Sequence, residues 1–327
     1  MLLLSSAPLK GQSLRAKEIV ARCIDLMELH AIQASTIDWE RERTRAFTAV
    51  SQHSDPDHIG PLVVDLFSAL NDHHAAFFLK DSAYRWSPHE PVVNDSIMQE
   101  WQRGAGVRAM LLDSVIGYLR IPGMPFQSRV DCDAKAQRLN DSLCSLLDHG
   151  IKGLVIDLRL NGGGAMYPMI LGVQQLLEKG TIGSFRAKGS SEPWRLTGTS
   201  FAIDTLVFAT MEPKCTRDAT DIPIVMLISP VTGSSAEFFL IAFQGRPNTV
   251  RLGSGSAGYT TATQGFPIGE DAFLLLSTAY GADRQGTVYP DAFDPDIPMA
   301  GTDSFNDIPH DSKVKAAIVW LRSAITD

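Results

Sequence analysis

The sequence predicts an α/β protein with a helical N-terminal region, and three patterns support this fold class. Apolar residues recur at helical spacing from about Ser13 to Leu79. The run Leu154–Leu158 is short, apolar and partly β-branched, and three glycines at 162–164 follow it before a helical pattern resumes. A second apolar run, Ile222–Ile228, passes through a serine-containing turn into another helical pattern. Strands that alternate with helices favour βαβ units with right-handed crossovers.

Taken in order, the N-terminal region ends with a helix from His58 to Leu70, which a Ser-Asp-Pro-Asp start signal at 54–57 precedes. A weaker region continues to Pro91, with Trp-Ser-Pro at 86–88 as punctuation, and strands are expected from about Val107. The later elements alternate between strand and helix. Strands are expected at Val115–Ile121, Leu154–Leu158, Ile222–Ile228, Thr249–Leu252 and Ala272–Leu276, helices at Ala134–Leu147, Met169–Leu177, Ala236–Phe243 and Val314–Leu321, and irregular chain around Ser184–Ala187 and Thr205–Phe208.

Length and composition narrow the function classes. A chain of 327 residues can hold two domains, and a net charge of −8 argues against nucleic acid as the main partner. No apolar run approaches the length of a membrane span. The four cysteines have neither metal-like nor framework-like spacing, so we interpret them mostly as free thiols. The first eight residues are either the remnant of a secretory signal, which would indicate the periplasm or export, or a chance start in a cytoplasmic chain.

The two glycine- or serine-containing turns are the candidate sites. The glycines at 162–164 leave backbone N–H groups bare at a helix N-terminus, where negative charge is stabilised. In the second turn Ser234 stands at a strand-to-helix corner, and the amide of Ser235 can donate to an oxyanion. Each turn also has a purely structural interpretation: a tight turn for the glycines and an N-cap for Ser234.

A serine nucleophile needs a base, and few residues can supply one. From Cys215 to Ser312 the chain has no lysine, and its one histidine there is His310. His73 and His74 end a helical pattern beside Asp72, which could orient an imidazole or raise its pKa. The structural alternative for this histidine pair is solvation at a helix end.

Five motifs in order resemble the carboxy-terminal processing (tail-specific) serine protease family, on its tricorn-like and retinoid-binding-like side. They are Leu-Asn-Asp-His-His at 70–74, Gly-Tyr-Leu-Arg-Ile-Pro at 117–122, Asp-Leu-Arg-Leu-Asn-Gly-Gly-Gly at 157–164, Gly-Ser-Ser-Ala-Glu at 233–237 and Asp-Pro-Asp-Ile at 294–297. Any one of these motifs is weak evidence, but the ordered set is specific and covers most of the chain from Leu62 to Pro298.

The sequence departs from the family pattern in two respects, the groups that would assist the serine and the space for a PDZ domain. Tyr259 stands where the lysine-dyad members have their lysine, so a Ser–Lys dyad is excluded by residue type and a histidine base remains. The acidic residue that supports this histidine in the tricorn-like arrangement has no clear match, and Asp283 and Asp291 are the candidates. No space is left for a PDZ domain between the helical region and the core.

The resemblance implies a helical domain at 1–100 and, at 101–327, a crotonase/ClpP-like α/β core of repeated ββα units. It implies a serine-type peptidase, a hydrolase that acts on peptides or unfolded protein segments without metal or organic cofactor. Ser234 would be the nucleophile, His74 the general base, and the amides of Gly163 or Gly164 and of Ser235 the oxyanion hole. The rival class is a non-catalytic binding module of the same fold that holds a small apolar ligand or a peptide.

Overall fold

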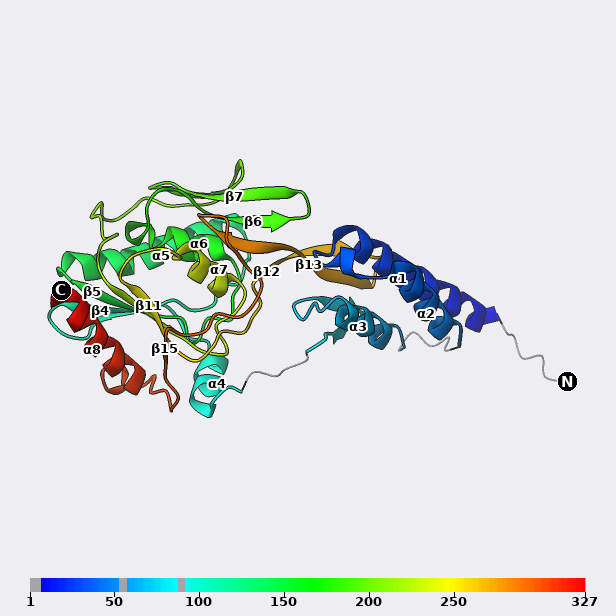
Figure 1. Cartoon of the computed structure of the whole chain (residues 1–327), viewed down its shortest axis with the longest axis horizontal. Coiled ribbons are helices and arrows are strands. Elements are labelled where there is room, and N and C mark those ends of the chain that lie inside the picture. The colour runs from blue at the N-terminus through cyan, green and yellow to red at the C-terminus, as the bar shows by residue number, and fades with distance from the viewer. Residues whose placement is uncertain (1–6, 53–57, 88–91, 327) are drawn as a thin grey trace. The chain divides into compact units, whose positions relative to one another are not determined.

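A computed structural model describes residues 7–52, 58–87 and 92–326 of the chain (Figure 1). The chain forms two compact units: residues 1–90 with 261–280, and residues 91–260 with 281–327. The sequence placed the division at residue 100 and assigned 261–280 to the core. The structure groups this segment with the N-terminal helices because its strands pair with a strand of that region. Pairing between segments almost 200 residues apart leaves no local pattern in the sequence.

The first unit packs three helices on a small antiparallel sheet. The helices are α1 (Ala7–His30), α2 (Trp39–Gln52) and α3 (Ile59–Ala69), and the strands are β1 (Ala76–Leu79), β2 (Ser82–Tyr84), β12 (Thr261–Pro267) and the first part of β13 (Ala272–Asp283). Its apolar core joins the helices to β1 and β13. The helical pattern therefore ends at Leu70 as expected, but the residues before Leu79 form a strand. The start signal at 54–57 and Pro88 lie outside the described residues.

The second unit contains a six-stranded sheet in the order β15-β11-β10-β5-β4-β3. All of its neighbouring strands run parallel except β3, which pairs antiparallel with β4. The strands are β3 (Arg108–Leu111), β4 (Ile116–Arg120), β5 (Gly153–Asp157), β10 (Ile224–Ile228), β11 (Thr249–Gly253) and β15 (Ile297–Pro298). The expected strands at 115–121, 154–158, 222–228 and 249–252 are thus confirmed with bounds shifted by a few residues.

Helices cover both faces of this sheet, as Figure 1 shows for α5 and α8. The helices are α4 (Asp95–Gln102), α5 (Arg129–Asp148), α6 (Met166–Leu171), α7 (Ser235–Ala242) and α8 (Ser312–Thr326). Side chains of α4 and α8 share a buried apolar cluster with β4, β5, β10 and β11. The helix expected as far as Leu177 is shorter: α6 stops at Leu171, and a 3₁₀ turn follows at Gln174–Leu176. The α/β fold with N-terminal helices is confirmed.

The stretch expected to be irregular is instead a set of antiparallel strands. They are β6 (Gly180–Ala187), β7 (Ser190–Leu196), β8 (Ser200–Ile203) and β9 (Leu206–Thr210). Charged and small residues interrupt the apolar alternation in these strands, because many of their residues are exposed or only partly buried.

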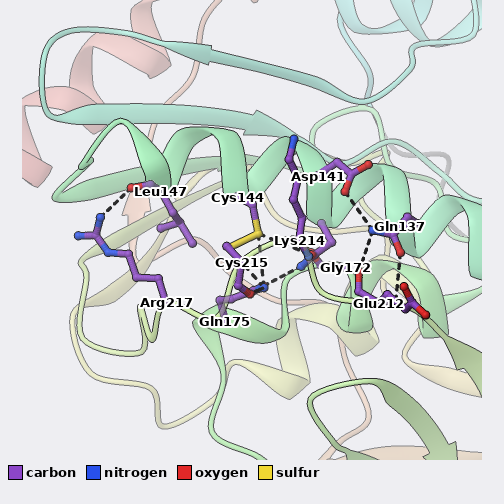
Figure 2. The surroundings of a disulfide bond; sticks show 11 residues. Gln137, Asp141, Cys144, Leu147, Gly172, Gln175, Glu212, Lys214, Cys215 and Arg217 are labelled. Carbon is purple, nitrogen blue, oxygen red and sulfur yellow. Dashed lines mark hydrogen bonds between the residues drawn. A yellow bond between two sulfur atoms is a disulfide. The ribbon is translucent and has the colours of Figure 1, made fainter.

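Two of the four cysteines form a disulfide, which corrects the expectation of mostly free thiols. Cys144 on α5 is bonded to Cys215, 71 residues later, and Cys23 and Cys132 are free and buried. Figure 2 shows the Gln175 side chain beside this bond, where its amide donates to the Cys215 carbonyl at 3.0 Å. Sequence spacing could not reveal the pair because the fold, not the local sequence, brings the two residues together. Among the described residues, no helix has the length and apolar character needed to cross a membrane.

Candidate active site

The glycine turn and the serine turn lie side by side at the carboxyl ends of two neighbouring parallel strands. They follow β5 and β10, which are neighbours in register from Leu154 opposite Ile224 to Asp157 opposite Leu227. The carboxyl ends of neighbouring parallel strands are where ligand sites form in α/β sheets. Four hydrogen bonds hold the turns together: Ser229 Oγ to the Arg159 carbonyl at 2.8 Å, Thr232 Oγ1 to the Leu158 carbonyl at 2.9 Å, the Gly233 amide to the Asn161 carbonyl at 3.1 Å and Ser235 Oγ to the Gly164 carbonyl at 2.5 Å.

Gly163 lies directly against Ser234. A Cβ atom built on Gly163 would be 2.8 Å from Ser234 Cβ and 3.3 Å from Ser234 Oγ. The backbone has positive φ at this contact, +106° at Gly163, +112° at Gly164 and +55° at Ser234, which glycine adopts freely but which strains Ser234. A positive φ is rare for a residue with a side chain, and strained serines at strand-to-helix corners expose the hydroxyl for reaction.

The N–H groups of the glycine turn have different partners. The Gly163 amide donates to Asn161 Oδ1 at 3.0 Å, so it is already engaged. Within the residues that the structure describes, the Gly164 amide has no hydrogen-bond acceptor, and Gly164 is itself exposed to solvent. The Ser235 amide opens α7, where the first N–H groups of a helix have no intrahelical acceptor. Gly164 and Ser235 are therefore the amides available to an oxyanion.

Glu237 is a functional candidate that the sequence analysis did not single out. Its buried carboxylate accepts hydrogen bonds from the Ser234 amide at 2.9 Å, Ser256 Oγ at 2.6 Å and the Gly258 amide at 2.8 Å. Burial raises the pKa of Glu237 to about 7, although these hydrogen bonds favour the ionised form. The Ser-x-x-Glu spacing of Ser234 and Glu237 is a capping-box pattern, and it was the available signal.

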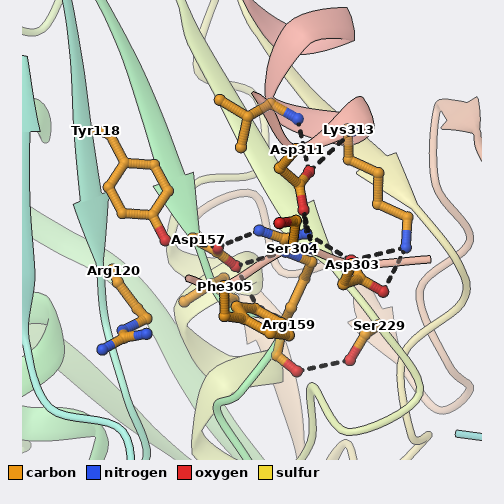
Figure 3. A network of polar contacts seen from close by, with 12 residues as sticks. Tyr118, Arg120, Asp157, Arg159, Ser229, Asp303, Ser304, Phe305, Asp311 and Lys313 are labelled. Atoms are coloured by element: carbon orange, nitrogen blue, oxygen red, sulfur yellow. Dashed lines mark hydrogen bonds and ion pairs between the residues drawn. The ribbon is translucent and has the colours of Figure 1, made fainter. Parts of the chain in front are cut away.

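A buried ionic network surrounds Arg159, which lies shortly before the glycine turn in the sequence (Figure 3). Arg159 pairs with Asp157 at 2.6 Å, with Asp311 at 2.9 Å and with Asp303 at 2.5 Å, and Lys313 pairs with Asp303 at 2.8 Å. Burial would raise the pKa of Asp157, but attraction to the Arg159 guanidinium outweighs it and the pKa is lowered. Three carboxylates and two cations thus fix the backbone that leads into Asn161 and the glycines.

In the other unit, His74 belongs to a chain of side-chain hydrogen bonds. Its Nδ1 lies 3.1 Å from Thr261 Oγ1, which is 2.8 Å from Ser277 Oγ. Ser277 Oγ donates to Asp72 Oδ1 at 2.7 Å, and the Ser277 amide donates to Asp72 Oδ2 at 3.0 Å. Asp72 also accepts from the amides of His74 and Ala75. The carboxylate in this cluster is therefore that of Asp72, which the hydrogen bonds join to His74 through two hydroxyls.

This chain of hydrogen bonds assigns the tautomer of His74. Ser277 uses its one hydroxyl proton on Asp72, so it accepts from Thr261. Thr261 then has no proton left for the imidazole and accepts from Nδ1–H of His74. The neutral ring consequently carries its lone pair on Nε2, as a general base requires. Burial lowers the pKa of His74 to about 4, which keeps the ring neutral at physiological pH. Thr261 and Ser277 carry no local signal that would have identified them.

The remaining residues that the sequence analysis proposed as supporting groups are not hydrogen-bonded to His74 in the bonds described above. The Tyr259 ring packs on Gly233, where an added Cβ would be 3.3 Å from Tyr259 Cδ2. Asp283 accepts from the Gln285 and Thr287 amides and from Tyr289 Oη, so it closes its own turn. Asp291 is exposed.

Neither the last histidine considered as a base nor, within the ranges that the structure describes, a cluster of metal ligands adds to this site. His310 is paired with Asp307 at the surface, at 2.9 Å. Among the described residues, no group of three or more potential metal-ligating side chains gathers in one place.

Residues 115–299, more than half of the chain, match the family model described as peptidase family S41. The chain belongs to this family. The match includes both turns of the site, and it confirms the resemblance seen in the motifs.

Individual relatives agree with membership of family S41. The chain is 33% identical over 182 residues to the nisin-resistance protein of Lactococcus lactis subsp. lactis, covering 55% of this chain and 53% of that protein. It is 29% identical over 172 residues to a carboxy-terminal-processing protease of Bartonella bacilliformis, covering 53% of this chain and 36% of that protein. The chain thus matches about half or less of the length of these relatives. The structure of a lipoprotein from Streptococcus agalactiae shares the fold, with a TM-score of 0.67 at 20% identity over 99% of both chains.

Proposed function

We propose that this family S41 chain is a serine peptidase that cleaves peptide bonds through an acyl-enzyme on Ser234. The observation that carries the proposal is the contact between the two turns. It combines a serine at φ +55°, a glycine too close to it to bear a side chain, and the amides of Gly164 and Ser235 beside it. A binding module has no need of a strained, partly exposed serine next to backbone N–H groups that can bind an oxyanion.

In this mechanism Ser234 Oγ attacks the carbonyl carbon of the peptide and its proton passes to Nε2 of His74. The negative charge that develops on the carbonyl oxygen is stabilised by the N–H groups of Gly164 and Ser235. His74 then protonates the leaving amine as the peptide C–N bond breaks. Water, deprotonated by the same imidazole, hydrolyses the acyl-enzyme and restores Ser234.

The substrate class follows from the family and the relatives: a peptide or an unfolded segment of a protein. The exposed, open backbone around Gly162 and Gly164 suits an extended chain. Because one relative is a nisin-resistance protein, nisin belongs in the set of peptides to be tested beside unstructured protein tails.

The decisive experiment is labelling with a fluorophosphonate probe combined with peptide hydrolysis. Ser234→Ala and His74→Ala should each lower kcat by at least about 10³-fold, and the double variant should be no worse, because the pair acts as one unit. Thr261→Val removes the hydroxyl that holds Nδ1–H of His74, and it should lower kcat by about 10- to 100-fold with KM almost unchanged.

His73→Ala is the matched control for His74→Ala and should keep wild-type turnover. Labelling of Ser235 would move the nucleophile by one residue. Activity in both histidine variants would refute the serine–histidine mechanism. A wild-type chain that binds peptides, resists the probe and cleaves nothing would instead be the binding module.

A further inference from the structure

Trp101, on α4, lies beside the catalytic turns although no motif includes it. A Cβ atom built on Gly162 would be 3.7 Å from both Cζ2 and Nε1 of the Trp101 indole, and 3.8 Å from the carbonyl oxygen of Val231. Gly162 directly precedes Gly163, which contacts Ser234, and Val231 belongs to the nucleophile turn. The indole therefore adjoins the glycine turn at Gly162, which in turn lies against Val231 of the serine turn.

The exposure of Trp101 is unusual for such a large apolar side chain. It is 47% exposed, whereas Trp194, in the same unit, is fully buried. Met98, one turn earlier on α4, is 36% exposed and extends the same apolar face. The Trp101 Nε1–H group has no acceptor within the part of the chain that the structure describes, so it is available to a ligand.

Three contacts hold in place the helix that carries Trp101. Ile97 is buried against the sheet, and Asn94 Nδ2 donates to Asp303 Oδ2 at 2.6 Å. Glu100 pairs with Arg120 of β4 at 3.4 Å. A helix held at three points presents its remaining face rigidly, which is what a recognition surface requires.

We propose that Trp101 forms a subsite for a large apolar side chain of the peptide, adjacent to the bond that Ser234 cleaves. The inference rests on the proposed peptidase function and adds the residue class that the enzyme selects. The indole face and Met98 provide the apolar contact, and the missing side chain at Gly162 leaves the space in front of them open. Nε1–H can donate to a peptide carbonyl and so fix the orientation of the bound chain.

The test measures preference rather than activity alone. Short glycine- and serine-rich peptides that carry a single phenylalanine, stepped through each position around the cleaved bond, are compared with peptides that carry serine in its place. At one position the wild-type chain should favour phenylalanine in kcat/KM. Trp101→Ala should reduce that preference by about 10- to 50-fold, and Trp101→Phe should retain most of it.

Val319→Ala is the matched control, because Val319 is an exposed apolar residue on α8 of the same unit and should change nothing. Circular dichroism verifies that each variant is folded. If Trp101→Ala does not fold, Trp101→Gln serves as the polar replacement. An unchanged phenylalanine preference in a folded, active Trp101 variant would overturn the subsite and leave the proposed peptidase function intact.

A second measurement separates the two proposals from each other. Fluorescence anisotropy records binding of the labelled phenylalanine peptide to Ser234→Ala, with and without Trp101→Ala. Weaker binding in the double variant supports the subsite even if no peptide is cleaved by the wild-type chain, an outcome that would defeat only the peptidase function. Equal binding by the two variants would overturn the subsite.

Discussion

Replacing Gly163 with alanine should damage catalysis much more than stability. The new Cβ would lie 2.8 Å from Ser234 Cβ and 3.0 Å from the Gly233 carbonyl oxygen, and Gly163 itself has a φ of +106°. An alanine there both strains its own backbone and collides with the proposed nucleophile. The two effects can be measured separately because only the second depends on Ser234.

The size of each effect follows from the structure. Ordinary van der Waals contact for a Cβ begins at 3.4 Å, so Ser234 Cβ and the new atom must separate by 3.4 minus 2.8, or 0.6 Å. Because a displacement of about 1 Å at a reacting group can cost about 100-fold in rate, we expect kcat to fall by about 10- to 100-fold. The backbone at positive φ should cost about 1–3 kcal/mol of unfolding free energy.

Gly180 provides a matched control on the same unit. Its φ is +108°, almost the value at Gly163, but an added Cβ there has no atom within 4 Å. Gly180→Ala should therefore lose a similar unfolding free energy and retain wild-type kcat. Urea unfolding gives the first quantity, and peptide hydrolysis under saturating substrate gives the second.

The prediction fails if Gly163→Ala is folded and keeps wild-type kcat, since Ser234 then need not hold its position. It also fails if Gly180→Ala loses kcat to the same degree, because the loss would then come from general destabilisation. Equal unfolding free energies with unequal kcat values are the expected outcome.

Two further predictions concern the buried carboxylate and the disulfide. The pKa of Glu237 is raised from 4.5 to about 7, so its contribution to stability is complete below 4.5 and is lost as pH rises through about 7. Activity should rise over that same range, because the ionised carboxylate is needed to hold the Ser234 amide, and Glu237→Gln should flatten both profiles. Reduction of the Cys144–Cys215 bond, which closes a loop of 71 residues, should cost up to about 4 kcal/mol of unfolding free energy.

Each of these outcomes has a control. The pKa of His74 is lowered to about 4, well below that of Glu237, so the two groups should affect activity in different pH ranges. An activity profile that rises only near pH 4 would contradict the role of Glu237. Cys132 is free and buried, and Cys132→Ser should remain as sensitive to reductant as the wild-type chain. Equal melting temperatures with and without reductant would contradict the stabilising role of the disulfide.

The sequence predicted the two turns well because each is specified locally. The apolar run before Asn161 predicts a strand, and the three glycines that follow predict an abrupt turn of the chain. Ser234, three residues before Glu237 and directly before an apolar helix, is marked in the same way. That the turns meet also follows from parallel pairing of the strands before them, which alternating strands and helices favour.

The parts that the sequence could not predict depend on contacts between distant segments. Thr261 and Ser277 reach Asp72 because β12 and β13 pair with each other and β13 pairs with β1, almost 200 residues away in the chain. The disulfide between Cys144 and Cys215 depends equally on how a loop packs on α5. Thr261, Ser277 and the two cysteines stand in no local pattern, whereas Asp72 belongs to the motif at 70–74.

The buried ionic network connects the glycine turn with the helix that carries Trp101. Asp303 accepts from Arg159, which leads into the glycine turn, and from Asn94, which fixes the helix that carries Trp101. Removing one member of such a network leaves a buried charge without its partner, which costs about 3–5 kcal/mol. The proposed oxyanion amides and the proposed apolar subsite therefore share a single support. We infer that this support keeps the distance between the bond to be cleaved and the side chain to be recognised constant, as selection of one peptide position requires.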